Sequence, residues 1–224
     1  MQTPIPGQRG PSSAARWLVG LIGLAALIGG ALFAKALLLQ PLPPPPALGQ
    51  GVTRLDAPRA LTDFRLVDHT GAVFDQGRLR GHWTFLFFGY SLCPDICPTT
   101  MSTLNAVAQA LADRAERRPQ YVFVTIDPER DTPEQLAKFV PYFNPTFLGV
   151  TGEPDAIKAL TRQLGILYLK AEPERSEGYL MDHSASILLI DPEGRFHAVM
   201  SPPFDPTGMA RNFQLMADYY EATR

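Results

Sequence analysis

Two cysteine side chains, Cys93 and Cys97, are the residues of this chain best suited to chemistry. They are its only cysteines, and they lie in "FGYSLCPDICPTT", separated by Pro94, Asp95 and Ile96. Two thiols so close together can form a disulfide, exchange with a disulfide of another molecule, or bind a metal ion as thiolates. A disulfide across so short a loop would constrain little of the chain. A redox-active or metal-binding pair is therefore the better interpretation.

The prolines of this loop predict how the two sulfurs are held. Pro94 and Pro98 each follow a cysteine, so both cysteines are biased away from helical conformation. Pro98 suits the first position of a helix, which makes Cys97 similar to an N-cap residue. The unpaired N–H groups and the dipole at a helix N-terminus favour a thiolate. We therefore expect a reactive thiolate at Cys97.

A metal bound by two cysteines needs at least one further ligand. Zinc sites usually have four ligands, whereas two thiolates and one imidazole form a soft set that suits copper, above all Cu(I). The chain has four histidines, and ordinary surface or structural roles are expected for His69, His82 and His197. His183 lies in "YLMDHSAS", on an expected loop that enters the sheet and can approach the cysteine loop. The nearby thioether of Met181 is assigned to packing.

Strand-like and helix-like segments alternate along most of the chain. The expected elements are a hairpin at 63–74, a strand at 83–90, a helix at 98–117, a strand at 121–127, a helix with a capping box at Thr132, a strand at 147–152, a helix carrying Ile157, Leu160 and Leu164, a hairpin at 184–200 and a final helix opened by Asp205 and Pro206. This order predicts an α/β fold whose mixed sheet is covered by helices on both sides. The cysteine loop follows a central strand and leads into a helix.

The N-terminal region predicts a membrane anchor and a spacer. Residues 17–34 carry no charge, and the apolar segment extends to residue 39 if Lys35 reaches a headgroup. Arg9 and Arg16 precede it, which places residues 1–16 in the cytoplasm and the rest of the chain across the membrane. A cleaved signal peptide, with "AKA" at 34–36 as its cleavage site, is the alternative. The proline-rich residues 40–51 form a linker, and residues 52–224 form one domain.

Composition excludes nucleic acid as a partner. The formal net charge is −2 for 224 residues, and no dense basic segment occurs. Two cysteines also cannot make a disulfide-rich scaffold, so the pair is a candidate for function.

Several segments, taken together, resemble one known family. The segments are "FGYSLCPDICPTT", "VTIDPERDTPEQL", "LGVTG" and "DHSASILLIDPEGR", and they lie in family order from about Leu61 to Tyr220. They are similar to those of the SCO/SenC family, the membrane-tethered copper chaperones of cytochrome c oxidase assembly.

The resemblance implies a thioredoxin-like fold with extra elements around 167–181. It also implies one copper ion per chain, as Cu(I) or Cu(II), bound by Cys93, Cys97 and His183. The implied partners are a copper donor protein and the copper-bearing subunit of cytochrome c oxidase. The implied location is the inner membrane, with the domain on the periplasmic side.

Four positions around this ligand set need separate interpretation. The family often has a histidine before the first cysteine, whereas this chain has Leu92, so a polar role at that position is in doubt. Asp127 and Asp131 are explained mainly as turn and cap residues, with partner contact or support of the site as the alternative. Asp182 either orients the imidazole of His183 or is an ordinary loop carboxylate.

Two functions compete at this stage. The first is a metallochaperone that delivers copper to the dinuclear copper centre of the oxidase. The second is a thiol-disulfide oxidoreductase that reduces the cysteines of that centre through Cys93 and Cys97, without needing a histidine. A thiol peroxidase is a weaker third possibility because no separate peroxidatic motif is present.

Overall fold

The structure is a computed structural model that describes residues 13–38, 42–113, 118–171 and 179–224. The predictions for residues 1–12 and 39–41, for 114–117 of the helix expected at 98–117, and for 172–178 of the extra stretch lie outside the described residues. The expected helix ends earlier than predicted, at Ala110, and residues 111–113 form a turn. The chain divides into two units, one of Met1–Pro45 with Ala222–Arg224 and the other of Pro46–Glu221.

The first unit contains one long apolar helix, α1 (Ser13–Leu38). Its segment Trp17–Lys35 is 19 residues long and has a mean hydropathy of 2.2. About 20 such residues suffice to cross a bilayer as a helix. An N-terminal apolar helix is therefore present as expected, and it is compatible with membrane anchoring.

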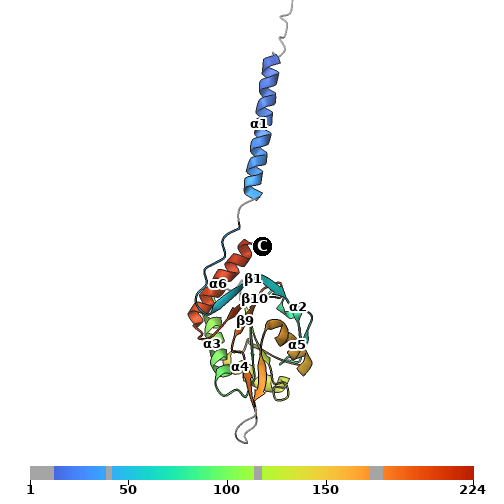
Figure 1. Cartoon of the computed structure of the whole chain (residues 1–224), viewed down its shortest axis with the longest axis vertical. Helices are drawn as coiled ribbons and strands as arrows, with labels where there is room; N and C mark the ends of the chain where they lie inside the picture. Colours follow the sequence, from blue (N-terminus) through green and yellow to red (C-terminus); the bar gives the residue numbers. More distant parts are fainter. Residues whose placement is uncertain (1–12, 39–41, 114–117, 172–178) are drawn as a thin grey trace, which may run out of the picture. The chain divides into compact units, whose positions relative to one another are not determined.

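The second unit is built on an eight-stranded mixed sheet (Figure 1). Its strands are β1 (Val52–Ala60), β2 (Arg65–Asp68), β3 (Val73–Asp75), β4 (Thr84–Gly89), β5 (Gln120–Thr125), β6 (Leu148–Thr151), β9 (Ile187–Ile190) and β10 (Arg195–Met200). Their spatial order is β1-β10-β9-β4-β5-β6-β2-β3. The pairs β4–β5 and β5–β6 are parallel, and the other pairs are antiparallel. A further pair, β7 (Tyr168–Ala171) and β8 (Leu180–His183), forms a separate two-stranded sheet.

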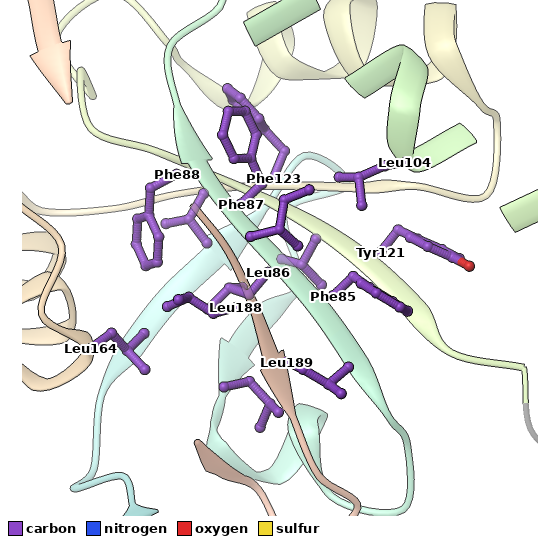
Figure 2. Close-up of a cluster of buried hydrophobic side chains, with 14 of the residues drawn as sticks. Phe85, Leu86, Phe87, Phe88, Leu104, Tyr121, Phe123, Leu164, Leu188 and Leu189 are labelled. Carbon is purple, nitrogen blue, oxygen red and sulfur yellow. The ribbon is translucent and has the colours of Figure 1, made fainter. Parts of the chain in front are cut away.

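Helices cover both faces of the main sheet. They are α2 (Gln76–Leu79), α3 (Ile96–Ala110), α4 (Pro133–Phe143), α5 (Pro154–Leu164) and α6 (Pro206–Ala222). All six residues of β4 are buried, as expected for a central strand with helices on each side. Figure 2 shows Leu104 of α3 with Phe85 and Tyr121 on one side of β4, and Phe88 with Leu164 of α5 on the other. The predicted thioredoxin-like α/β arrangement is confirmed.

Two strand regions were not predicted from the sequence, for different reasons. Strand β1 contains Pro58 and has a register shift between Arg54 and Arg59 where it pairs with β10, so its residues lack the alternation that marks a strand. Strands β7 and β8 are only four residues long and have mostly exposed or half-buried side chains. A strand that packs little apolar surface leaves a weak pattern in the sequence.

Two expectations about the cysteine and histidine segments were wrong. Helix α3 begins at Ile96, with Asp95 as its N-cap, so Cys97 lies inside the first turn. His183 is the last residue of strand β8, paired with Tyr168, and does not belong to a loop. The first error arose because Pro98 was placed at the first helical position, whereas proline is also tolerated elsewhere in the first turn.

Candidate metal centre

The cysteine loop begins where β4 ends, and Gly89 lets it pass close to α3. A Cβ atom added at Gly89 would lie 2.7 Å from the Sγ atom of Cys97 and 3.0 Å from the ring of Phe123. Contacts below 3 Å are too short for a carbon atom in this position. The glycine therefore makes room for the sulfur of Cys97 against the end of the central strand.

Cys93, Cys97 and His183 meet at this point. One possible ligand atom from each lies within 4.8 Å of the others, and the Sγ atom of Cys97 is 3.4 Å from Nε2 of His183. Metal–sulfur bonds of about 2.3 Å hold two sulfur ligands of one ion up to about 4.6 Å apart. Both cysteines are free thiols in this structure. The three side chains are therefore close to the spacing that a single ion requires.

The imidazole of His183 is oriented by a backbone carbonyl. Its Nδ1 atom is 3.1 Å from the carbonyl oxygen of Ser184. A carbonyl oxygen only accepts hydrogen bonds, so Nδ1 carries the proton and Nε2 keeps a lone pair directed at Cys97. Burial also lowers the pKa of His183 below its usual value. The ring is thus in the neutral tautomer that a metal ligand needs.

Two aromatic rings hold this imidazole in place. The ring centroids of Phe87 and Tyr90 lie 6.0 and 6.2 Å from that of His183. Tyr90 is buried, and burial raises the pKa of its hydroxyl, with both cysteines contributing to the shift. Sequence reasoning missed Tyr90, although its position between the central strand and Cys93 was a usable signal.

Asp182 does not have the orienting role considered for it. Its side chain is exposed, and the imidazole donates its hydrogen bond from Nδ1 to the backbone carbonyl oxygen of Ser184 instead. The charge of Asp182 makes only a minor contribution to the pKa of His183, after burial and the Ser184 carbonyl.

The expectation of a thiolate at Cys97 was also wrong for the metal-free protein. Cys97 is fully buried, and burial raises the pKa of its thiol, with Cys93 and Asp131 adding to the shift. The backbone N–H of Cys97, in the first turn of α3, donates a hydrogen bond to Sγ of Cys93, with 3.4 Å between the nitrogen and the sulfur. The helix N-terminus therefore acts on Cys93, which is half-buried, and Cys97 stays protonated until a cation offsets its charge.

Asp131 supports the cysteine loop through hydrogen bonds to Ser91. Its carboxylate accepts hydrogen bonds from the backbone N–H of Ser91 at 2.9 Å, from the Ser91 hydroxyl, and from the hydroxyl of Thr125 at 2.6 Å. The cap of α4 is Thr132, which accepts from the N–H of Gln135. Thr132 is the N-cap of α4 as predicted, whereas the side chain of Gln135 donates to the hydroxyl of Ser91 and not to the cap. Asp131 fixes Ser91, the residue two positions before Cys93, and supports the site.

The other singled-out residues lie outside this group. His69 accepts a hydrogen bond from the N–H of Gly149, and His82 is exposed. His197 is buried beside Asp191, with 3.5 Å between Nδ1 and the carboxylate. Met181 packs against the core as predicted. Among the described residues, no other group of three or more His, Cys, Asp and Glu side chains has metal-binding spacing.

Leu92 stands at the rim of the site. Its side chain is 54 % exposed, and that of Ile96 on the same loop is 39 % exposed. Neither can take part in proton transfer. The edge of the cysteine loop is thus apolar at Leu92 and Ile96.

The fold and these side chains together define a thioredoxin-like domain with a Cys-Cys-His group at the end of its central strand. The chain matches the sequence model of the SCO1/SenC family over residues 52–218, and it belongs to that family. An SCO2-like protein of Rickettsia prowazekii is 35 % identical over 179 residues, which are 79 % of this chain and 85 % of that protein.

Solved structures agree with this assignment. Arabidopsis thaliana ScoI, crystallised with copper bound, is 33 % identical with a TM-score of 0.67, and the match covers 70 % of this chain and 98 % of that one. Yeast Sco1 with copper bound is 31 % identical with a TM-score of 0.66, covering 72 % of this chain and 90 % of that one.

Proposed function

We propose that this protein is a membrane-anchored copper metallochaperone that delivers copper to the dinuclear copper centre of cytochrome c oxidase. The observation that carries the proposal is the group of Cys93, Cys97 and His183, whose ligand atoms lie within 4.8 Å of one another. Membership of the SCO1/SenC family and copper in the related plant and yeast structures support it.

The chemistry of the three ligands favours copper over zinc. Two thiolates and an imidazole are soft donors, and three-ligand sites of this kind suit Cu(I). A structural zinc site would need a fourth ligand, and the described residues offer no fourth His, Cys, Asp or Glu side chain to this group. We infer that one copper ion is bound per chain, as cargo.

The unequal burial of the two sulfurs suits transfer of that cargo. Cys93 is half-buried, whereas Cys97 is buried. An incoming ligand of the acceptor can reach Cys93 first. Cys97 and His183 retain the ion until the acceptor has engaged it, so copper never needs to be free in solution.

The anchor determines where this exchange occurs. We propose that α1 spans the inner membrane and that the domain lies on the periplasmic side, supported by Arg9 and Arg16, which precede the apolar segment Trp17–Lys35. The acceptor is then the copper-bearing subunit of the oxidase, and a separate donor protein supplies the ion.

Copper stoichiometry on the full chain in detergent tests the proposal. The reduced chain should retain about one Cu(I) after dialysis, and Cys93→Ser, Cys97→Ser and His183→Ala should each lose it or bind it far more weakly. His82→Ala is the control, because His82 is exposed and outside the site. Equal affinity of the parent and His183→Ala would overturn the three-ligand site.

A thiol-disulfide oxidoreductase is the alternative function, and the closeness of two free thiols favours it. The Cys93 thiolate would attack one sulfur of an oxidised target, forming a mixed disulfide and releasing the other target thiolate. Cys97 would then give its proton to the released target thiolate and attack Cys93 Sγ, which breaks the mixed disulfide and releases the second target sulfur as a thiolate. The target is thereby reduced by two electrons, and the Cys93–Cys97 pair is oxidised to a disulfide.

An exchange assay without copper separates the two functions. An oxidised peptide carrying the two cysteines of the oxidase copper centre serves as the target. Rapid reduction of the peptide by the parent and by His183→Ala alike would favour the oxidoreductase. Slow reduction together with copper retention would favour the metallochaperone.

A further inference from the structure

The hairpin that carries His183 is not part of the main sheet. Within the described residues, β7 and β8 pair only with each other. A cavity of about 140 Å³ separates the hairpin from the loop after β5, with Ile126, Tyr168 and Met181 among its lining residues. Backbone pairing with the main sheet therefore does not fix the position of the hairpin among the described residues, and its apolar contacts with the core come from Tyr168 and Met181.

Arg130 connects the loop after β5 to the base of this hairpin. Its Nη1 atom donates a hydrogen bond of 3.0 Å to the carbonyl oxygen of Tyr179, the residue before β8. Its guanidinium carbon lies 3.8 Å from the centroid of the Tyr179 ring. An ion pair with Asp127 holds the guanidinium in this orientation.

Tyr179 is bound to the same loop through its hydroxyl. The hydroxyl donates to Oδ1 of Asp127 at 2.7 Å, so Asp127 contacts both Arg130 and Tyr179. Lys170 of β7 places its Nζ atom 3.6 Å from the Tyr179 ring centroid and 3.7 Å from the Glu129 carboxylate. Both strands of the hairpin are thus tied to the loop after β5.

The guanidinium also reaches toward the metal-binding group. Its carbon lies 5.5 Å from the ring centroid of Tyr90, and the Tyr90 ring packs edge-on against the imidazole of His183. Arg130 therefore contacts both the base of the hairpin and an aromatic ring that holds His183.

We propose that Arg130, held by Asp127, is a positioning residue that latches the β7–β8 hairpin and thereby keeps His183 in reach of Cys93 and Cys97. The effect on copper rests on the proposed three-ligand site. With the latch intact the hairpin presents a third ligand, and with the latch broken the two sulfurs remain without the imidazole.

Arg195 provides a matched control. It forms an i,i+4 ion pair of 2.8 Å with Asp191, and the two side chains are 30 % and 0 % exposed. The corresponding values for Arg130 and Asp127 are 24 % and 4 %. Asp191 and Arg195 flank the β9–β10 turn, away from the metal-binding group. Loss of Arg195 should therefore disturb the fold to a similar extent without affecting the imidazole.

A double-mutant cycle on the full chain in detergent tests the latch, with Cu(I) affinity measured by competition with a chromogenic Cu(I) chelator. Arg130→Gln should weaken affinity about tenfold, as residues that support metal ligands do. The same change in a His183→Ala background should have no further effect, since Arg130 acts through His183. Arg195→Gln should leave affinity unchanged. The proposal would be overturned if Arg130→Gln lowered Cu(I) affinity equally in the parent and in the His183→Ala background, or if it did not lower the affinity of the parent.

Hydrogen exchange on the metal-free chain provides a second measurement that needs no copper. Arg130→Gln should accelerate exchange of the amides of 168–171 and 180–183, and Arg195→Gln should not. If His183→Ala leaves copper affinity unchanged, the three-ligand site fails, and exchange alone decides on the latch. In that case, amide exchange in Arg130→Gln equal to that in the parent overturns the latch. Faster exchange confined to the hairpin supports the latch.

Discussion

The Nε2 atom of His183 lies 3.4 Å from the Sγ atom of Cys97, although 86 positions separate these residues in the chain. The histidine is carried by a hairpin separate from the main sheet, and the cysteine by the first turn of α3. The short distance between the two atoms therefore depends on residues that fix the hairpin and the first turn of α3. Such residues should affect copper binding without touching copper, and several predictions concern them.

Gly89→Ala should weaken copper binding, because the new Cβ atom would lie 2.7 Å from Sγ of Cys97. The sulfur must move away from the other ligands, and we expect Cu(I) affinity to fall by about tenfold or more. Competition with a chromogenic Cu(I) chelator measures the change.

Gly149→Ala is the control for this crowding. A Cβ atom there would lie 2.8 Å from Cγ2 of Val140 and 3.0 Å from Cβ of Leu136, in contact with α4 and not with a sulfur. This variant should lose stability and keep its copper affinity when folded. Equal losses of affinity in the two glycine variants would contradict a specific role for Gly89.

Asp131→Asn should loosen the cysteine loop. The carboxylate accepts three hydrogen bonds from Ser91 and Thr125, and the amide of asparagine replaces one accepting oxygen with a donor. A buried donor left without a partner costs about 1–3 kcal/mol, so the free energy of unfolding should fall by that amount in urea titrations. Asp95→Asn is the control, since Asp95 is exposed and makes no capping bond with its side chain. Equal stability of Asp131→Asn and the parent would show that the network is not needed.

The orientation of the anchor is testable with reporter fusions. If residues before α1 remain in the cytoplasm, alkaline phosphatase fused after Arg224 should be active, because it folds with disulfides only outside the cytoplasm. Arg9→Glu combined with Arg16→Glu should reduce that activity by weakening the positive-inside signal. Bright fluorescence of a green fluorescent protein fused at the same point would contradict the proposed orientation.

Apart from the edge strand β1, the strands of the main sheet and its longer helices were predictable because their segments are buried in a regular pattern. Strand β4 is fully buried, and its apolar sequence predicts a central strand directly. The cysteine loop could be placed after this strand for the same reason. The short hairpin β7–β8 could not be predicted, since strands whose side chains are all exposed or half-buried have no apolar period.

The ligands were predictable by residue type, but their electrostatics were not. The soft donor atoms of cysteine and histidine indicated Cys93, Cys97 and His183 as metal ligands. The raised pKa of Cys97, however, comes from burial by residues distant in sequence. The hydrogen bond that orients the imidazole runs from Nδ1 of His183 to the backbone carbonyl oxygen of Ser184, and a backbone acceptor leaves no sequence signal. The latch between Arg130 and Tyr179 spans 49 positions and likewise depends on the folded arrangement.

The stability of the metal-free protein should fall in alkaline solution because of Cys97. Burial raises the pKa of its thiol above the usual value, whereas an unfolded cysteine loses its proton near pH 8.5. The folded state therefore binds this proton more tightly, so the contribution to stability is complete below about pH 8.5 and is lost as the pH rises further. Between about pH 9 and 10 the free energy of unfolding should fall by about 1.4 kcal/mol per pH unit from this group. Urea unfolding of the reduced, chelator-treated chain measures it, and Cys97→Ala should remove most of the slope. An identical slope in the parent and in Cys97→Ala would show that other groups cause the alkaline loss.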